Sequence, residues 1–179
     1  MSTANLSLLK RLKEVSYLEG EFITRAGKPT SYYIDKYSFS TIPDILLPLC
    51  QELAQIMPDP STYDRIAAPE LGAVAIAAVL STVVGKPFVI VRKQSKDYGT
   101  QKLIEGNFVP GETVAMIEDI LTTGGAVLRA CDIAIEAGLK VKDIVGVINR
   151  EEGAEATIRE RGFTMTALFT SSQLRTLKT

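Results

Sequence analysis

Histidine is absent from this sequence of 179 residues, so the commonest general base and the commonest metal ligand are excluded from its chemistry. Cysteine is scarce as well: Cys50 and Cys131 are the only two, and both lie in apolar patterns with helical spacing. Such cysteines are typical of buried thiols in a reducing compartment, and they favour neither a disulfide nor a metal pair. We therefore expect a cytoplasmic protein.

Long apolar runs and an excess of charge are also lacking. No apolar run reaches the roughly 18 residues that a membrane helix needs, and the N-terminal residues do not form a secretory signal. The net charge is −1, which gives no electrostatic basis for binding nucleic acid or an anionic membrane. The hydrophobic content of 46% is ordinary for a globular chain, and the length predicts one domain with a full core.

Short apolar runs alternate with helical patterns along most of the sequence. The runs are nearly all apolar, which predicts an α/β fold with a mostly parallel central sheet flanked by helices. Ligands of such sheets bind beyond the carboxyl ends of the strands. Pro48 is expected in the first turn of its helix, where a missing N–H is tolerated. We expect helices at 5–18, 45–56, 73–84, 126–137 and 155–161, a hairpin at 20–37, a loop at 38–43, and strands at 65–68, 87–91, 114–117, 144–148 and 164–169.

The segment from 114 to 130 predicts an anion site. An apolar strand at 114–117 is followed by a polar loop at 118–125 and then by the start of a helix. Free N–H groups of the first helical turn point into such a loop, and the helix dipole favours negative charge there. Glycines let the backbone approach a phosphate closely. The loop carries two hydroxyls and two glycines: Thr122, Thr123, Gly124 and Gly125.

Two acids in front of this loop indicate which phosphate compound fits. Neither the lysine of a Walker loop nor the G-x-G-x-x-G of a dinucleotide loop is present, and Glu118 and Asp119 stand there instead. Carboxylates repel phosphate but bind vicinal hydroxyls and Mg²⁺. A ligand with a phosphate at one end and a diol nearby, such as a ribose 5-phosphate, satisfies both. The alternative is an ordinary strand–turn–helix whose acids face solvent.

The connection that follows strand 87–91 is long and cationic. More than twenty residues separate this strand from the next clear one, and loops of such length are usually functional or disordered. A cationic loop beside a phosphate site predicts a lid that closes over a highly charged ligand and excludes water. A solvated run of charge is the alternative. The first eleven residues of this connection contain four cations: Arg92, Lys93, Lys96 and Lys102.

These motifs carry a resemblance to a known family. VAMIEDILTTGGA, at 114–126, resembles the phosphoribosyl-diphosphate-binding motif of type I phosphoribosyltransferases: four apolar residues, two acids, two variable residues, a threonine and small residues. RKQSKDYGTQKLIEG, at 92–106, resembles the catalytic loop of orotate phosphoribosyltransferases, whose pattern is Arg-Lys, two variable residues, Lys, Asp, His or Tyr, and Gly. The resemblance covers about residues 5–172. Supporting pieces are SYYID at 31–35, PELG at 69–72 and NREEG at 149–153.

The resemblance implies a fold and a reaction. It implies the type I phosphoribosyltransferase fold over a single domain, 1–179, in which about residues 1–40 and the C-terminal segment form a hood over the pyrimidine site and residues 92–106 form a mobile catalytic loop. Orotate and phosphoribosyl diphosphate would give orotidine 5′-monophosphate and diphosphate, with Mg²⁺ as cofactor. A homodimer is implied, with part of the catalytic loop reaching the neighbouring subunit.

The resemblance also assigns residues to phosphoribosyl diphosphate. Glu118 and Asp119 would hold the ribose hydroxyls, and residues 122–126 would bind the 5-phosphate. Lys96, Tyr98 and Asp119 are the implied catalytic residues. Mg²⁺ would be bound mainly through diphosphate and ribose hydroxyls, with Asp119 as a candidate contact through water. The full implied set is Arg92, Lys93, Lys96, Tyr98, Glu118, Asp119, Ile120, Leu121, Thr122, Thr123, Gly124, Gly125 and Ala126.

Orotate would be held by Thr122 and Arg150, since a guanidinium matches a carboxylate with two parallel hydrogen bonds. Arg25, Tyr32 and Tyr33 of the hairpin would lie against the pyrimidine. Adjacent strand residues point to opposite faces, so packing is the alternative role for the two tyrosines.

Three features depart from the common family pattern. Tyr98 stands where many members have histidine, Leu71 and Gly72 stand where many bacterial members have a lysine, and Arg25 stands where lysine is frequent. They affect the proton path and the diphosphate contacts, not the reaction class. Two alternatives stay open: a purine or other base phosphoribosyltransferase, and a non-catalytic regulator that senses phosphoribosyl diphosphate. The first gives Arg150 no carboxylate to bind. The near-neutral charge and the cationic loop argue against the second.

Overall fold

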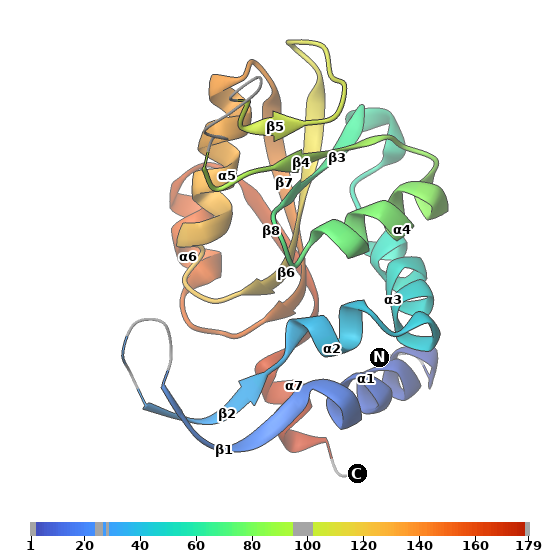
Figure 1. The fold of residues 1–179 in the computed structure, drawn as a ribbon, viewed down its shortest axis with the longest axis vertical. Coiled ribbons are helices and arrows are strands. Elements are labelled where there is room, and N and C mark those ends of the chain that lie inside the picture. Colours follow the sequence, from blue (N-terminus) through green and yellow to red (C-terminus); the bar gives the residue numbers. More distant parts are fainter. Residues whose placement is uncertain (1–2, 24–26, 28, 95–101, 178–179) are drawn as a thin grey trace.

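The structure is a computed structural model that describes residues 3–23, 27, 29–94 and 102–177. Figure 1 shows a central sheet with helices on both sides and a small hairpin layer at one end. Among the described residues, none of the helices combines the length and apolar character needed to cross a bilayer.

The central sheet has six strands in the order β5-β4-β3-β6-β7-β8. Neighbours from β4 to β8 pair in parallel, whereas the two-residue β5 pairs antiparallel with β4. The predicted α/β architecture with a mostly parallel sheet is thereby confirmed, and the carboxyl ends of its parallel strands lie at one edge. The strands are Arg65–Pro69 (β3), Phe88–Val91 (β4), Ile104–Glu105 (β5), Thr113–Leu121 (β6), Lys140–Asn149 (β7) and Thr164–Thr170 (β8).

Two hydrophobic clusters cover the two faces of the sheet. One joins α1, α3 and α4 to residues such as Ala115 and Ile117 of β6, and the other joins α5 and α6 to Val114 and Met116. The alternation along β6 follows from the period of two in a strand. The helices are Thr3–Ser16 (α1), Lys36–Ser40 (α2), Pro43–Ile56 (α3), Val74–Val84 (α4), Gly125–Glu136 (α5), Ala154–Glu160 (α6) and Ser171–Thr176 (α7), with a 3-10 turn at Pro60–Thr62 (η1).

The hairpin layer consists of strands Tyr17–Ile23 (β1) and Pro29–Ile34 (β2), followed by α2, with α7 beside them. The hairpin starts three residues earlier than predicted, because α1 ends at Ser16 and the next residue already pairs with Ile34. Figure 1 shows this layer at the sheet edge where β6 ends.

Strand β6 is longer than the sequence pattern predicts. Its parallel pairing with β7 continues from Glu118 opposite Gly146 to Leu121 opposite Asn149. The acid pair therefore lies in the strand, and its predicted place in the loop is wrong. Polar side chains do not prevent a strand when the backbone N–H and C=O groups find hydrogen-bond partners in the sheet, and here β7 provides those partners.

Residues 36–40 form helix α2, where a strand end and a loop are predicted. The side chain of Asp35 caps this helix: its Oδ1 accepts a hydrogen bond from the Tyr37 backbone at 3.0 Å, and its Oδ2 accepts one from the Ser38 hydroxyl at 2.8 Å. Tyr37 therefore belongs to the helix and not to the returning strand.

Two further differences concern helix ends. Pro48 lies inside α3 and not in its first turn, because α3 begins at Pro43, earlier than the predicted start at 45. Helix α7 was not predicted from the hydrophobic pattern, which is short there. It is initiated by a capping box between Thr170 and Gln173. Both cysteines are buried and free, and burial raises the pKa of each thiol to about 12.

Candidate functional site

Glu118 and Asp119 lie side by side at the carboxyl end of β6, and both are buried. Successive strand residues point to opposite faces, so the two carboxyls approach different neighbours. Glu118 lines a small hollow under the first turn of α5, together with Thr122 and Gly124. Asp119 faces α2 and the turn between β3 and α4.

Each carboxylate oxygen of Asp119 has a close neighbour. Its Oδ1 accepts a hydrogen bond from the Ile120 backbone at 2.6 Å, and its Oδ2 lies 2.9 Å from the Nζ of Lys36. The backbone of Gly72 closes the remaining side, since a Cβ at that position would lie 1.6 Å from Oδ2. The sequence requires glycine there for space, not for a turn conformation.

Glu118 has a different electrostatic environment. Burial raises its pKa well above the usual range, and the negative charge of Asp119 raises it further. Its Oε2 is buried and has no hydrogen-bond partner among the described residues. Lys36 lies close enough to oppose this effect, and its own pKa is raised by Asp119 and Glu118 although burial alone would lower it. Glu118 therefore favours its protonated form, while Asp119 lies against the cation of Lys36.

The loop after β6 leads directly into α5 through Gly124, whose φ of 85° is left-handed and suits glycine. No side chain of the described residues caps α5, so the N–H groups of its first turn keep their hydrogen-bonding capacity for another acceptor. Thr123 is exposed and Thr122 is half-buried, and Gly125 and Ala126 open the helix. This arrangement suits a phosphate.

Arg92 and Lys93 leave the end of β4 and are tied to the neighbouring turn by Glu70. The Lys93 backbone donates to Glu70 Oε1 at 2.8 Å, and the Arg92 guanidinium lies 3.9 Å from Oε2. Glu70 immediately precedes the Leu71–Gly72 pair that closes over Asp119. The base of the cationic loop and the acid pair are therefore joined through one short turn.

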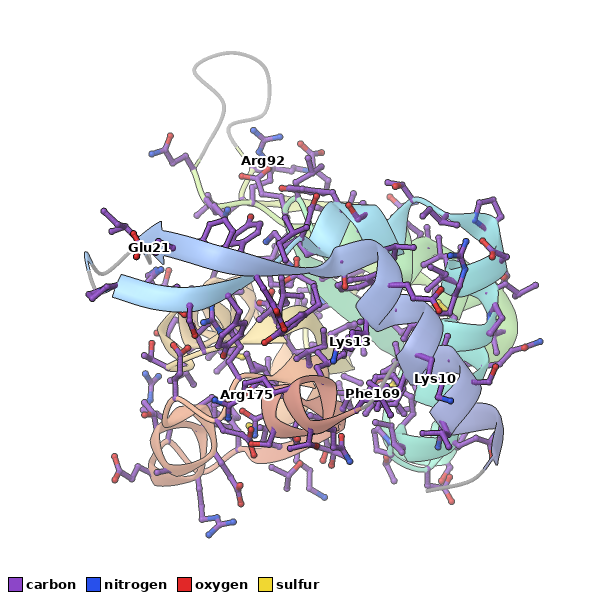
Figure 2. All side chains as sticks on the ribbon, turned by 90° about the horizontal axis from the view of Figure 1, so that it is seen from below. Lys10, Lys13, Glu21, Arg92, Phe169 and Arg175 are labelled. Atoms are coloured by element: carbon purple, nitrogen blue, oxygen red, sulfur yellow. The ribbon has the colours of Figure 1, made fainter. Side chains whose placement is uncertain are left out.

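Arg150 follows β7 and lies beside the end of β6, because its backbone N–H donates to the Leu121 carbonyl at 2.8 Å. Its guanidinium lies 4.9 Å from the centroid of the Tyr32 ring and 2.9 Å from the Glu152 carboxylate. Within the part of the chain that the structure describes, its buried Nε has no hydrogen-bond partner. Arg175 of α7, labelled in Figure 2, lies 5.8 Å from the same ring.

The two hairpin tyrosines point to opposite faces, as predicted. Tyr32 is 8% exposed and stacks on Tyr17 with ring centroids 5.4 Å apart. Tyr33 is 45% exposed and lies against Phe22 on the other face. Tyr32 is thus the tyrosine that shares a site with Arg150. Arg25, Lys96 and Tyr98 lie outside the described residues.

The structure adds one residue that sequence reasoning missed, Lys36. It follows the SYYID segment directly, and a cation at the end of a strand that reaches the sheet edge was the available signal. Ile120 and Leu121, by contrast, direct their side chains into the core and offer backbone alone.

The residues present fit a Mg²⁺ ion only in one way. Among the described residues, no group of three acidic, histidine or cysteine side chains could enclose a metal. Asp119 already pairs with Lys36. These observations suit an ion carried mainly by substrate oxygens, as Mg²⁺ with phosphates usually is.

Comparisons with known proteins agree with this geometry. The phosphoribosyl transferase domain family matches residues 45–165. The chain is similar to an orotate phosphoribosyltransferase of Methanopyrus kandleri, at 41% identity over 96% of this chain and 92% of the relative. A Pyrococcus horikoshii relative of the same name is 45% identical over 87% of this chain and 84% of its own. The crystal structure of Mycobacterium tuberculosis orotate phosphoribosyltransferase in complex with Fe(III) dicitrate superposes with a TM-score of 0.83, at 25% identity over 96% of this chain and 98% of the other.

Proposed function

The chain belongs to the orotate phosphoribosyltransferase family, and from that membership we propose that its sheet edge transfers the 5-phosphoribosyl group of phosphoribosyl diphosphate to orotate. The ribose C1–O bond to diphosphate breaks, and a bond from C1 to the orotate N1 forms. The products are orotidine 5′-monophosphate and diphosphate, a step of pyrimidine biosynthesis. The observation that carries the proposal is the uncapped start of α5 beside two buried acids on β6.

The 5-phosphate of the substrate would accept hydrogen bonds from the first-turn amides of α5 and from the hydroxyls of Thr122 and Thr123. Ile120, Leu121, Gly124, Gly125 and Ala126 would contribute backbone. The ribose hydroxyls would donate to Asp119, which lies beside Lys36, and would contact Glu118. This division places the anionic end of the sugar on the helix and its diol on the acids.

The diphosphate would lie toward Arg92 and Lys93, with Lys96 and Tyr98 of the same loop closing over it. Several negative charges develop or persist on the leaving diphosphate, so cations directed at it lower the barrier most. Mg²⁺ bound to the diphosphate and ribose oxygens would neutralise part of this charge, with Asp119 in reach through water. Lys96, Tyr98 and Asp119 are the proposed catalytic residues.

Orotate would occupy the space between Thr122 and Arg150. The Arg150 guanidinium has an unpartnered buried Nε and already stacks on Tyr32, so a carboxylate would complete its hydrogen bonding. Arg25 and Tyr33 stay in the proposal as further hairpin contacts to the pyrimidine. Because orotate binds as an anion, its N1 needs little help from a general base, which fits a chain without histidine.

The hairpin layer, with α7, would serve as the hood over the pyrimidine within a single domain of residues 1–179. The proposal includes a homodimer that shares the catalytic loop, residues 92–106. It also includes a cytoplasmic location, for which two buried free thiols are the support.

The direct test is the absorbance of orotate after addition of phosphoribosyl diphosphate and Mg²⁺. Loss of the orotate absorbance with release of diphosphate is expected. Adenine and hypoxanthine in place of orotate form the matched control. Turnover of a purine without turnover of orotate would contradict the proposal and favour a purine phosphoribosyltransferase. Binding of phosphoribosyl diphosphate without turnover of any base would favour a regulator.

A further inference from the structure

Lys36 is a cation placed directly on the proposed ribose-binding acid. Its Nζ lies 2.9 Å from Asp119 Oδ2, with the Lys36 side chain 32% exposed and that of Asp119 3% exposed. The contact joins α2, which belongs to the hairpin layer, to β6 of the central sheet. A mobile, solvated lysine gains little from a surface ion pair, but this partner is buried.

The local structure explains why the side chain lies there. Asp35 is tied to the end of α1, since its backbone N–H donates to the Ser16 carbonyl at 2.8 Å. The Asp35 side chain then caps α2 through Tyr37 and Ser38, which fixes the first residue of the helix, Lys36. Two anchored neighbours therefore aim Lys36 at the sheet edge.

The turn after β3 packs directly against the Lys36–Asp119 pair. A Cβ on Gly72 would lie 1.6 Å from Asp119 Oδ2 and 2.9 Å from Lys36 Nζ. The Ile120 backbone holds the other oxygen, Oδ1. Both oxygens of Asp119 thus have close neighbours, and losing Lys36 would remove the one that carries a positive charge from a buried acid.

We propose that Lys36 is a positioning residue of the phosphoribosyl site, which fixes Asp119 for the ribose hydroxyls and links the hairpin layer to that carboxylate. The inference rests on the proposed function for the identity of the ligand. Stability alone gives a weak reason for such a pair, because a buried ion pair is often no more stabilising than apolar residues of similar volume. A role in orienting the binding carboxylate gives a stronger reason for the pair. Loss of a residue that orients a ligating group typically lowers affinity or activity by about 10–100-fold.

The test uses direct binding, so that it does not depend on turnover. Isothermal titration would measure the Kd of phosphoribosyl diphosphate with Mg²⁺ for the full chain and for Lys36→Met, Lys36→Arg and Asp119→Asn. Lys86→Met is the matched control, because Lys86 also contacts an aromatic ring, at 5.4 Å, but lies before β4 at the opposite edge of the sheet. The melting temperature of each ligand-free variant would be recorded beside its Kd.

We expect Lys36→Met to raise the Kd by about tenfold or more and Lys36→Arg to recover most of it. In the Asp119→Asn background, Lys36→Met should have no further effect, because the lysine acts through that carboxylate. An unchanged Kd with a lowered melting temperature would overturn the inference, since Lys36 would then be structural. Additive effects in the double variant would overturn it too, because Lys36 would act on the ligand itself. Failure of the wild-type chain to consume orotate would instead count against the proposed function alone.

Discussion

The phosphoribosyl half and the orotate half of the proposed site are built differently. The first comes from one continuous segment, residues 118–126, with a strand end, a loop and a helix start in succession. The second is assembled from β2, the turn after β7 and α7, which meet around the Tyr32 ring. A continuous segment holds its geometry through its own backbone, whereas an assembled one depends on tertiary packing. Substitutions should therefore separate chemistry from stability in the first half and affect both in the second.

The largest effect is expected at Gly72, the point where a distant turn reaches the continuous segment. Gly72→Ala places a methyl group where Asp119 Oδ2 and Lys36 Nζ now lie, so the carboxylate or the turn must move. A displacement of about 1 Å in a catalytic arrangement can cost 100-fold. We expect kcat/KM for phosphoribosyl diphosphate to fall by at least about that factor, measured by initial rates at saturating orotate.

Leu71→Ala provides the control in the same turn. Leu71 is 64% exposed, and truncation of exposed side chains usually changes stability by less than about 0.5 kcal/mol. Equal losses for the two variants would show that any change in the turn is harmful, and would contradict the specific role of the space at Gly72.

The difference between the halves also explains how much the sequence could predict. The loop and helix start at 122–126 were predictable because their features are local: two hydroxyls, two glycines and a helical pattern. The parallel sheet was predicted because its strands are apolar on both faces. The extent of β6 was not predicted. Residues 118–121 pair with β7 in the folded sheet, and this pairing is not visible in a sequence where two of them are acidic.

The assembled half shows the complementary limit. Arg150 and Tyr32 are indicated only by the resemblance to family motifs. No local sequence pattern predicts that the Arg150 guanidinium lies 4.9 Å from the centroid of the Tyr32 ring. The pair of Lys36 and Asp119 was missed for the same reason, because 83 positions separate two residues that only the folded chain brings together. The sequence pattern at 20–37 predicts a hairpin that includes Asp35, so it does not indicate that Asp35 caps a helix beginning at Lys36.

Arg150 tests the assembled half next. Arg150→Met removes the guanidinium that we expect to hold the orotate carboxylate, and a charge-assisted hydrogen bond is worth about 1.5–3 kcal/mol. The KM for orotate should rise by roughly 10–100-fold, while the Kd for phosphoribosyl diphosphate stays within a factor of two or so. Steady-state kinetics and direct titration give the two values.

Arg150→Lys keeps the charge but loses the planar pair of donors, so it should restore only part of the orotate affinity. A rise in KM for phosphoribosyl diphosphate as large as that for orotate would break the separation of the halves. The chain would then have one cooperative site.

The two hairpin tyrosines offer a smaller and matched comparison. Tyr32→Leu removes a buried ring that stacks on Tyr17 and lies beside Arg150, whereas Tyr33→Leu changes an exposed one. The first should destabilise the fold by about 1–3 kcal/mol, or several degrees in melting temperature, and weaken orotate binding. The second should leave the melting temperature nearly unchanged. Similar effects on orotate KM would place both rings at the pyrimidine and weaken the contrast drawn from burial.

The smallest effect is expected from Glu118, and it depends on pH. Burial holds the folded-state pKa of Glu118 above the unfolded value of about 4.3. Below that unfolded value both states bind the proton, and the group contributes nothing to the difference. As the pH rises, the unfolded state ionises first, so stability falls until the folded-state pKa is passed. The neutral isostere should remove this cost.

Glu118→Gln should therefore raise the melting temperature of the ligand-free protein at pH 8 by a few degrees, given about 2–4 °C per kcal/mol for a domain of this size. At pH 4, where both states of the wild-type group are largely protonated, the two proteins should melt close together. Differential scanning calorimetry across this range measures both ends. A lower melting temperature for Glu118→Gln at pH 8 would mean that Glu118 is ionised in the folded protein and shares Lys36 with Asp119. The continuous half of the site would then hold two anions instead of one, and the lysine from the hairpin layer would be needed for both.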